Sequence, residues 1–402
     1  MKAVVFTLGC KVNEVESACI MAALENSGWE VDDALGYADA YVLNTCAVTR
    51  EAEKKSRQLI ARVRKFNPNA KIFVCGCASE KDGGSFISRG VTFVTGARKK
   101  QEILKAFAAE YGCAEQNFPY PKQTKTRAFI KIQDGCNNFC SYCIIPYLRG
   151  REVSRTVEDI VAEVNATDCP EIVLNGINIS SFSGGLDKLI TALAGTEKRI
   201  RLGSLECSVI TEELLKALKS LKDFAPQFHL SLQSGSDAVL KAMNRHYTRA
   251  QYLEKCALIY SYFPNAAITT DIIAGFPTET EEDFSESLSI IDEAGFARVH
   301  AFAFSPREGT VAYKMKDIPP EVKSERLHRL LKSAESTALR YAQKNLGSVA
   351  EIIAEEYDGQ FTCGYTGNYI RVYLPCRLEA GKKFEVTLLN IYKDGVSARL
   401  NG

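Results

Sequence analysis

Three cysteines stand close together in residues 136–143, which read CNNFCSYC. The C-x3-C-x2-C spacing leaves one thiol over in any disulfide pairing, so disulfides do not explain the segment. A structural zinc site takes four ligands, and no fourth Cys or His follows nearby. Three thiolates on one loop suit three irons of a cubane cluster. The segment therefore predicts that Cys136, Cys140 and Cys143 ligate a 4Fe–4S cluster.

The spacing of this motif also predicts a second cofactor. A catalytic metal site keeps an open position, and three protein ligands leave the fourth iron of a cubane open. An open, reducible iron can chelate the amino and carboxylate groups of S-adenosylmethionine and pass it an electron. The S–C bond then breaks and gives a 5′-deoxyadenosyl radical, which abstracts hydrogen from unactivated C–H bonds. Tyr142, between the last two cysteines, is a candidate contact for the cofactor's adenine, with plain packing as the alternative.

A second set of cysteines is scattered over residues 1–112, but its members share one placement. Cys10, Cys46 and Cys77 each follow a short apolar run that reads as a strand. The carboxyl ends of parallel strands meet at one edge of a sheet, where ligands collect. The pattern predicts a second 4Fe–4S cluster on these thiols, and Gly-Cys turns that arise by chance are the alternative.

Cys75 stands two residues before Cys77, and we predict that only Cys77 is a ligand. Residues 71–75 read as a buried parallel strand, from which Cys75 should project into helix packing. Gly76 can adopt backbone angles that are closed to other residues, and it can thereby deliver Cys77 onto the loop at the carboxyl edge.

Three regions separate by hydrophobic pattern, and together they predict an α/β protein of 402 residues. Residues 1–115 alternate short strands with helices, which indicates a parallel α/β domain. Residues 122–346 repeat strand and helix six times, which predicts a partial (β/α)6 barrel. Residues 347–402 switch to short strands with turn signals, which is typical of a small all-β barrel. The six candidate barrel strands lie at residues 129–132, 172–174, 200–202, 228–232, 268–273 and 299–304.

The distribution of charge is more informative than the net charge of +1. Residues 50–65 and residues 122–155 each carry seven basic and two acidic residues. Both stretches are candidate phosphate-contacting surfaces, with a solvated helix face and a charged linker as the alternatives. No apolar run is long enough for a membrane span and no signal peptide is recognisable, so we expect a soluble, cytoplasmic protein without a membrane partner.

Residues 134–155, which read DGCNNFCSYCIIPYLRGREVSR, resemble the cluster loop of the radical S-adenosylmethionine methylthiotransferases. The resemblance continues at residues 174–178 (LNGIN), 204–206 (SLE), 230–235 (LSLQSG), 243–245 (MNR) and 271–277 (DIIAGFP). It implies that strand-end residues hold the ribose, amino and carboxylate groups of the cofactor, at the end of the strands where barrel ligands bind. The candidates are Asn175, Glu206, Gln233, Ser234 and Arg245. Helix capping is the alternative for each of them, and Cys207 and Thr278 depart from the usual family pattern.

The N-terminal cysteines lie in motifs of the same family. Residues 7–13 (TLGCKVN), 44–46 (NTC) and 76–77 (GC) resemble its N-terminal domain, whose auxiliary cluster supplies the sulfur, and the C-terminal region is similar to the TRAM RNA-binding domain. TLGCKVN, followed by Glu16 and Ser17, most resembles the branch that acts on threonylcarbamoyl-adenosine in tRNA. The branches that act on isopentenyl-adenosine and on a ribosomal-protein aspartate usually read GCQMN and GCxKN, and they remain the alternatives.

The resemblance implies radical transfer of a methylthio group to C2 of the adenosine just 3′ of the anticodon. The implied partners are the tRNA anticodon loop, whose target base would be splayed from its stack, and an electron donor such as flavodoxin or ferredoxin. We expect the protein to be a monomer. The alternative from another class is a non-catalytic iron–sulfur sensor that binds RNA, which would have no use for the strand-end cofactor residues.

Overall fold

The computed structural model describes residues 1–113, 119–121, 123 and 126–401. The predicted domain boundaries at residues 115 and 122 lie outside the described residues. The chain divides into two compact units, and neither is continuous in sequence. The first comprises Met1–Gln123, Asp134–Glu152 and Arg307–Thr310, and the second comprises Thr124–Gln133, Val153–Pro306 and Val311–Gly402.

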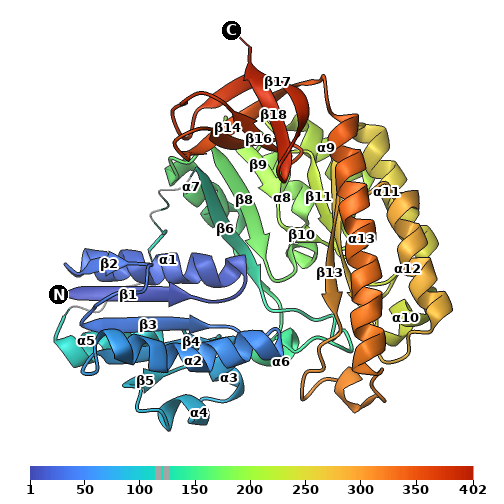
Figure 1. The fold of residues 1–402 in the computed structure, drawn as a ribbon. Helices are drawn as coiled ribbons and strands as arrows, with labels where there is room; N and C mark the ends of the chain where they lie inside the picture. Colours follow the sequence, from blue (N-terminus) through green and yellow to red (C-terminus); the bar gives the residue numbers. More distant parts are fainter. Residues whose placement is uncertain (114–118, 122, 124–125, 402) are drawn as a thin grey trace. The chain divides into compact units, whose positions relative to one another are not determined.

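The first unit is built on a five-stranded parallel sheet (Figure 1), as the sequence predicts. In sheet order the strands are β2 (Glu30–Asp32), β1 (Lys2–Thr7), β3 (Ala40–Thr45), β4 (Lys71–Gly76) and β5 (Phe93–Val94). The sequence does not predict β2, whose three residues include two acids and so carry no apolar run. All six residues of β3 are buried, because helices cover both faces of the sheet.

The helices of this unit divide between the two faces of the sheet. α1 (Lys11–Asn26) and α5 (Glu102–Tyr111) share one apolar cluster with one face. α2 (Arg50–Phe66) packs on the other face, together with the short helices α3 (Cys77–Lys81) and α4 (Gly84–Ile87). Residues 134–152 join this second cluster through two side chains. Ile144 directly precedes α6 (Ile145–Arg149), and Leu148 lies within that helix. The cysteine loop therefore packs on the N-terminal sheet.

The second unit contains the predicted partial barrel, and each of the six candidate strands is present. They are β6 (Arg127–Asp134), β8 (Glu171–Gly176), β9 (Arg199–Leu202) continued by β10 (Ser204–Leu205), β11 (Gln227–Leu230), β12 (Ala267–Ala274) and β13 (Arg298–Ala303). A short strand, β7 (Val153–Ser154), flanks β6. The paired barrel strands β6, β8 and β9, and likewise β10 to β13, run parallel.

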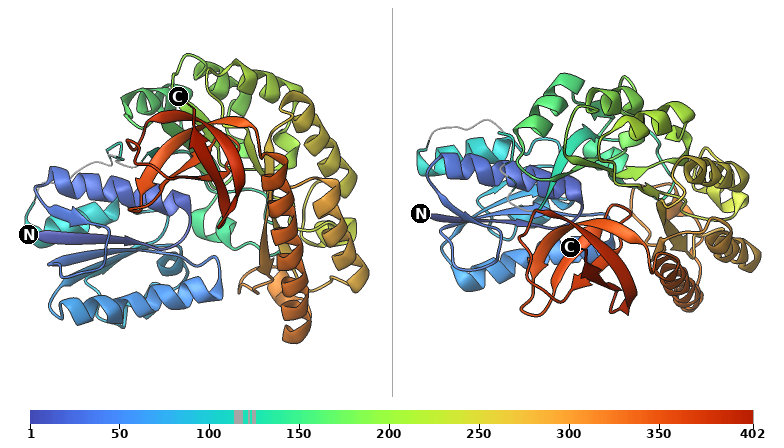
Figure 2. Two further views of the ribbon diagram at one scale, coloured as in Figure 1. Left: turned by 45° about the horizontal axis from the view of Figure 1, so that its top comes forward. Right: turned by 90° about the horizontal axis from the view of Figure 1, so that it is seen from above.

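Helices cover the outer face of this curved sheet (Figure 2) and close the largest apolar core of the chain. They are α7 (Val157–Ala166), α8 (Leu186–Ala192), α9 (Glu212–Ser220), α10 (Asp237–Ala242), α11 (Arg249–Tyr262), α12 (Glu281–Glu293) and α13 (Pro320–Lys344). Single turns of 3-10 helix occur at η1 (Ile179–Ser181), η2 (Cys207–Val209) and η3 (Ala312–Lys314). Threonine caps begin several helices; Thr248 and Thr280, for example, form capping boxes at α11 and α12.

The C-terminal strands close into a barrel, as predicted, in the order β14 (Val349–Tyr357), β15 (Thr362–Thr366), β16 (Arg371–Leu374), β18 (Gly395–Leu400) and β17 (Lys383–Tyr392). Ion pairs join it to the amino ends of the partial-barrel strands. Arg127 pairs with Glu355 at 2.6 Å, and Arg199 pairs with Glu351 at 2.5 Å. The small barrel is thus docked at the end of the sheet opposite the candidate cofactor residues.

Candidate iron–sulfur and cofactor sites

The loop that carries Cys136, Cys140 and Cys143 has a constrained backbone. Gly135 has φ +70°, and a Cβ there would lie 2.1 Å from the carbonyl oxygen of Arg151. The Cys136 N–H donates to the Gly150 carbonyl at 3.1 Å, so the loop begins and ends at one point. Gly135 is therefore required for the closure of the loop.

Aromatic and cationic side chains support the same loop from within. Phe139 has φ +47°, a left-handed conformation that is rare for a residue with a side chain. Its ring packs edge-on against Tyr147 at 5.6 Å and beneath the Arg151 guanidinium at 4.6 Å. Cys140 is buried, Cys136 and Cys143 are half-buried, and the Asn138 N–H points at Cys136 Sγ at 3.5 Å. Strain of this kind persists where surrounding contacts hold a functional loop.

The structure brings Cys10, Cys46 and Cys77 together at the carboxyl edge of the N-terminal sheet. Cys10 is the N-cap residue of α1, Cys46 follows β3, and Cys77 is the first residue of α3. Burial raises the pKa of the Cys46 and Cys77 thiols, and the Cys10 thiolate acts in the same direction on both. Cys10 is exposed while the other two are buried, so the site opens to solvent on the Cys10 side.

Two glycines permit this close approach. Gly9 has φ +111°, and a Cβ there would lie 2.9 Å from the Cβ of Cys46. Gly76 has φ +108°, and a Cβ there would lie 2.4 Å from the carbonyl oxygen of Thr45. The Gly-Cys pairs in the sequence therefore have a steric cause, because a side chain at either glycine would push the strand ends apart.

We expect Gly76→Ala to lower the free energy of unfolding by more than about 2 kcal/mol, because it adds backbone strain and a clash with Thr45. Gly28→Ala is the matched control, since Gly28 has φ +83° but nothing within 4 Å of an added Cβ. Strain alone should cost the control about 1 kcal/mol. Urea unfolding measures both, and equal losses would contradict the steric account.

Cys75 lies on the opposite face of the sheet from Cys77. It is fully buried in the apolar cluster that the sheet shares with α1 and α5 and that includes Phe107. Burial raises the pKa of its thiol to about 12. Cys77 belongs to the other apolar cluster, on the face that α2 covers.

Buried cations surround the Cys10–Cys46–Cys77 site. Arg149 is 1% exposed and bonds to Asn13 at 2.6 Å, Asp134 at 3.0 Å and Glu16 at 3.1 Å. Arg307 is also buried, and its pair with Glu53 is 2.6 Å long. Both guanidiniums lie near enough to Cys46 to favour its thiolate. Sequence reasoning treated Arg149 only as part of a basic stretch and overlooked Arg307, which has no local signal.

The surroundings fit a bound cluster in two respects. The Nε atoms of Arg149 and Arg307 are buried without a hydrogen-bond partner among the described residues, and sulfur acceptors would satisfy them. In the described part of the chain, only His229, Asp271 and His300 form a trio whose ligand atoms lie within 4.8 Å of one another. Neither cysteine trio is therefore drawn together as tightly as a single ion requires, whereas a cubane spreads its thiolates over different irons.

The strand-end candidates lie in the second unit, and three of them have geometry that suits a ligand. Asn175 Nδ2, at the end of β8, is buried without a hydrogen-bond partner among the described residues. Arg245 Nη1 donates to Glu206 Oε1 at 3.1 Å, which places a cation and a carboxylate side by side. S-adenosylmethionine carries a positively charged amino group and a negatively charged carboxylate. The Glu206 carboxylate suits the amino group, and the Arg245 guanidinium suits the carboxylate.

The remaining candidates are placed differently. Gln233 has φ +74°, and its N–H donates to the Asp271 carbonyl at 2.8 Å. Ser234 is fully buried, and its hydroxyl lies 3.2 Å from that of Ser287 in α12, so this side chain packs the strand end against a helix. Tyr142 is half-buried in the cysteine loop of the first unit.

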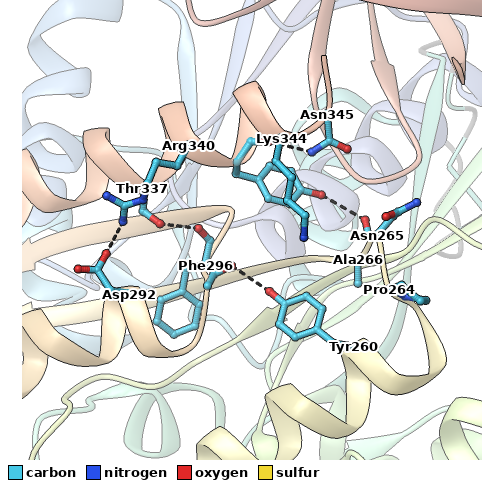
Figure 3. A pocket seen from close by; sticks show the side chains of 12 residues that line it. Tyr260, Pro264, Asn265, Ala266, Asp292, Phe296, Thr337, Arg340, Lys344 and Asn345 are labelled. Atoms are coloured by element: carbon cyan, nitrogen blue, oxygen red, sulfur yellow. Dashed lines mark hydrogen bonds and ion pairs between the residues drawn. The ribbon is translucent and has the colours of Figure 1, made fainter. Parts of the chain in front are cut away.

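A surface pocket in the second unit lies between α11, α12 and α13 (Figure 3). Its polar groups hold α11 and α13 to the segment that follows α12. Tyr260 Oη donates to the Gly295 carbonyl at 2.9 Å, and Thr337 Oγ1 donates to the Phe296 carbonyl at 2.7 Å. None of the predicted site residues lines it, so we assign it to helix packing.

The two basic stretches differ in the structure. On α2, the side chains of Lys54, Lys55, Arg62 and Lys65 are exposed, whereas Arg57 pairs with Glu53 at 2.8 Å. In the second stretch Lys122 and Lys125 lie outside the described residues, and the arginines at 127, 149 and 155 are engaged in ion pairs. The prediction of a phosphate-contacting surface at residues 122–155 is therefore wrong for these arginines, because carboxylates already neutralise them.

Comparison with known proteins follows the same division of the chain. A model of the radical SAM superfamily matches residues 130–291, and the model of uncharacterized protein family UPF0004 matches residues 2–96. The chain is 39% identical to threonylcarbamoyladenosine tRNA methylthiotransferase MtaB of Chlamydia pneumoniae, with 92% of this chain and 90% of that protein covered. It is 36% identical to the Bacillus subtilis protein of the same name, with 91% and 88% covered.

More distant similarities are of two kinds. The chain is 33% identical to tRNA-2-methylthio-N(6)-dimethylallyladenosine synthase of Thermodesulfovibrio yellowstonii, with 96% of each covered. Among solved structures, the radical S-adenosylmethionine methyltransferase TsrM of Kitasatospora setae superposes with a TM-score of 0.59 at 11% identity, with 84% of this chain and 89% of that chain covered. This last likeness concerns the fold alone. In the described residues, every helix is too short or too polar to cross a membrane.

Proposed function

Because the chain belongs to the family of radical S-adenosylmethionine tRNA methylthiotransferases, we propose that it converts N6-threonylcarbamoyladenosine beside the anticodon to its 2-methylthio derivative. The observation that carries the proposal is the pairing of two cysteine trios with a match over 92% of the chain to a relative named for this reaction. The radical SAM family implies one 4Fe–4S cluster and S-adenosylmethionine.

We propose that Cys136, Cys140 and Cys143 hold the cluster that binds S-adenosylmethionine, and that Cys10, Cys46 and Cys77 hold an auxiliary cluster. When bound, the first supplies the electron for cofactor cleavage and the second supplies sulfur. The chain's own residues orient these groups. Arg149 and Arg307 place positive charge near Cys46 and carry buried N–H donors, and we propose that Asn175, Glu206 and Arg245 present polar groups to the cofactor.

The test is anaerobic reaction of the reconstituted protein with an anticodon stem-loop that carries threonylcarbamoyladenosine, followed by nucleoside mass spectrometry. We expect the 2-methylthio nucleoside and 5′-deoxyadenosine. Product on an isopentenyl-adenosine loop alone would assign the chain to the sister activity. Absence of deoxyadenosine would favour the iron–sulfur sensor, and product on a ribosomal protein would favour that branch. A flavodoxin or ferredoxin is the proposed electron donor and can replace the chemical reductant.

The exposed cations of α2 are the proposed tRNA-contacting surface. Lys55, Arg62 and Lys65 line a surface pocket together with Phe6 and Leu8, so basic and apolar groups meet there. Phosphate contacts by Lys and Arg supply much of the affinity for RNA and make it dependent on salt. Arg57 is left out of this surface because its pair with Glu53 is 2.8 Å long and largely shielded from solvent, whereas the pair of Lys55 with Glu51 is 3.8 Å long and exposed.

We expect the double variant Lys55→Glu/Arg62→Glu to bind tRNA about 10-fold more weakly near 0.1 M salt, with a shallower salt dependence. Cofactor cleavage should not change. Lys216→Glu/Lys219→Glu, on the exposed face of α9 in the second unit, is the matched control with the same change of charge. Filter binding over a salt series measures both variants, and equal affinities would make α2 a merely solvated face.

A further inference from the structure

Three polar side chains on neighbouring strands of the partial barrel have no part in the sites above. They are His229 in β11, Asp271 in β12 and His300 in β13, and one ligand atom from each lies within 4.8 Å of the others. Two of the chain's four histidines thus meet at one point, although they are 71 positions apart in sequence. Polar side chains that meet on neighbouring strands of a barrel form a candidate binding site.

The strand register places this trio on the sheet face that is turned away from the helices. Asp271 pairs directly with His300, and His229 pairs with Thr269. Their sequence neighbours Phe228, Ile272 and Val299 point the other way, into the apolar core beneath the helices. Side chains alternate between faces along a strand, so the trio occupies the inner face. The His229 and Asp271 side chains keep 15% and 29% exposure there.

Hydrogen bonds hold this group in place. His229 Nδ1 lies 3.0 Å from Thr269 Oγ1, and His229 Nε2 lies 3.3 Å from Asp271 Oδ2. The His229 imidazole is thus fixed at both nitrogens and orients the Asp271 carboxylate. The carbonyl of Asp271 accepts from the N–H of Gln233, a candidate cofactor residue. The trio therefore lies level with the candidate cofactor residues on the adjacent strand end.

An aromatic surface lies next to the trio on the same face. Phe302 follows His300 by two residues in β13, pairs with Ile273 and is 50% exposed. Two residues along a strand span about 7 Å. An exposed aromatic ring is a stacking platform for an unpaired base. If a base stacks on Phe302, a substituent that extends a few bonds from the base can reach the polar trio.

A metal ion is a poorer fit to the trio than a polar ligand. The ligand atoms lie within 4.8 Å of one another, but both ring nitrogens of His229 already have hydrogen-bond partners. Its Nδ1 faces Thr269 Oγ1 and its Nε2 faces Asp271 Oδ2, so a metal ion would have to displace one of them. A polar organic ligand, in contrast, can form hydrogen bonds with the trio while these side chains keep their observed positions.

We propose that His229, Asp271 and His300 recognise the N6 substituent of the target adenosine, with the base stacked on Phe302; this inference rests on the proposed function. A threonylcarbamoyl group offers N–H and hydroxyl donors and a carboxylate. Asp271, oriented by His229, accepts from the donors, and His300 donates to the carboxylate. A dimethylallyl group, which appears in the name of the more distant relatives, is a hydrocarbon that can neither donate to Asp271 nor accept from His300. The trio therefore favours the threonylcarbamoyl group through hydrogen bonds that only this substituent can make.

The test compares His300→Leu and Asp271→Asn with the wild-type holoenzyme on three anticodon stem-loops. These carry threonylcarbamoyladenosine, isopentenyl-adenosine or unmodified adenosine. We expect each variant to raise KM and Kd for the threonylcarbamoyl loop about 10-fold or more, with affinity for the unmodified loop unchanged. Deoxyadenosine formation without RNA should also persist. His328→Leu, at an exposed position of α13, is the matched control and should behave as the wild type.

The outcomes distinguish failure of this inference from failure of the proposed function on which it rests. If the wild type converts only the isopentenyl loop, the proposed function fails. If the wild type converts the threonylcarbamoyl loop and both variants keep its preference over the unmodified loop, the trio does not read the substituent. Zinc analysis of the wild type and His300→Leu is the further arm. One equivalent of zinc that disappears with His300 would make the trio a metal site and overturn the proposal.

Discussion

Replacement of Cys10, Cys46 and Cys77 by alanine is expected to eliminate methylthio product while 5′-deoxyadenosine formation stays measurable. The reason is that separate loops position the two cysteine trios. The Cys136–Cys143 loop closes on itself through Gly135 and Gly150, and no backbone bond in that closure involves the N-terminal trio. The converse replacement, at Cys136, Cys140 and Cys143, should abolish deoxyadenosine formation altogether.

Product and deoxyadenosine are measured in the same anaerobic reactions by mass spectrometry, with iron content determined for each sample. A triple replacement of Cys19, Cys113 and Cys376 is the matched control, because these cysteines are half-buried and none is a predicted ligand. Methylthio product from the Cys10–Cys46–Cys77 variant would refute the auxiliary-cluster assignment. Loss of all iron from that variant would show that the two sites do not assemble independently.

Single replacements at Cys75 and Cys77 are expected to differ sharply, although the residues are two positions apart. Cys77→Ala should lose roughly half of the bound iron, that is, one of two clusters, and all methylthio product. The reason is that Cys77 is the first residue of α3, at the edge of the sheet where Cys10 and Cys46 also lie. Cys75→Ala should keep both, with a stability loss of about 1 kcal/mol for the missing buried sulfur. Cys75 itself belongs to the apolar cluster on the opposite face of the sheet.

Anaerobic reconstitution followed by iron analysis and product assay measures this contrast, and urea unfolding checks that both variants are folded. The two variants are controls for each other, since each removes one buried sulfur. The reverse pattern, with iron lost from Cys75→Ala and kept in Cys77→Ala, would move the ligand to Cys75. It would also mean that Gly76 does not turn the chain in the direction that its φ of +108° indicates.

Much of the fold follows from local pattern. The six barrel strands and the closed C-terminal barrel can be predicted because apolar runs and turn residues report short-range structure. The short β2 escapes prediction because three residues, two of them acidic, carry no such run. The convergence of Cys10, Cys46 and Cys77 is also predictable, since strands of a parallel sheet present their carboxyl ends at one edge.

The tertiary structure alone decides which side chains meet across elements. Arg149 stands among basic residues in the sequence, yet burial against Glu16 and Asp134 removes it from the surface and places it beside the N-terminal cysteines. Arg307 reaches the same surroundings from a segment far along the chain. Sequence spacing holds no information on such contacts, because they depend on how separate elements pack.

The same distinction applies to the chemical groups of the chain: some can be recognised from the sequence, and others only from the tertiary structure. The sequence by itself determined the cofactor class, because three thiols within eight residues must share one loop whatever the rest of the chain does. Only the tertiary structure brought His229, Asp271 and His300 together, because their meeting depends on the register of three strands, and a shift of one residue would turn a side chain to the other face of the sheet.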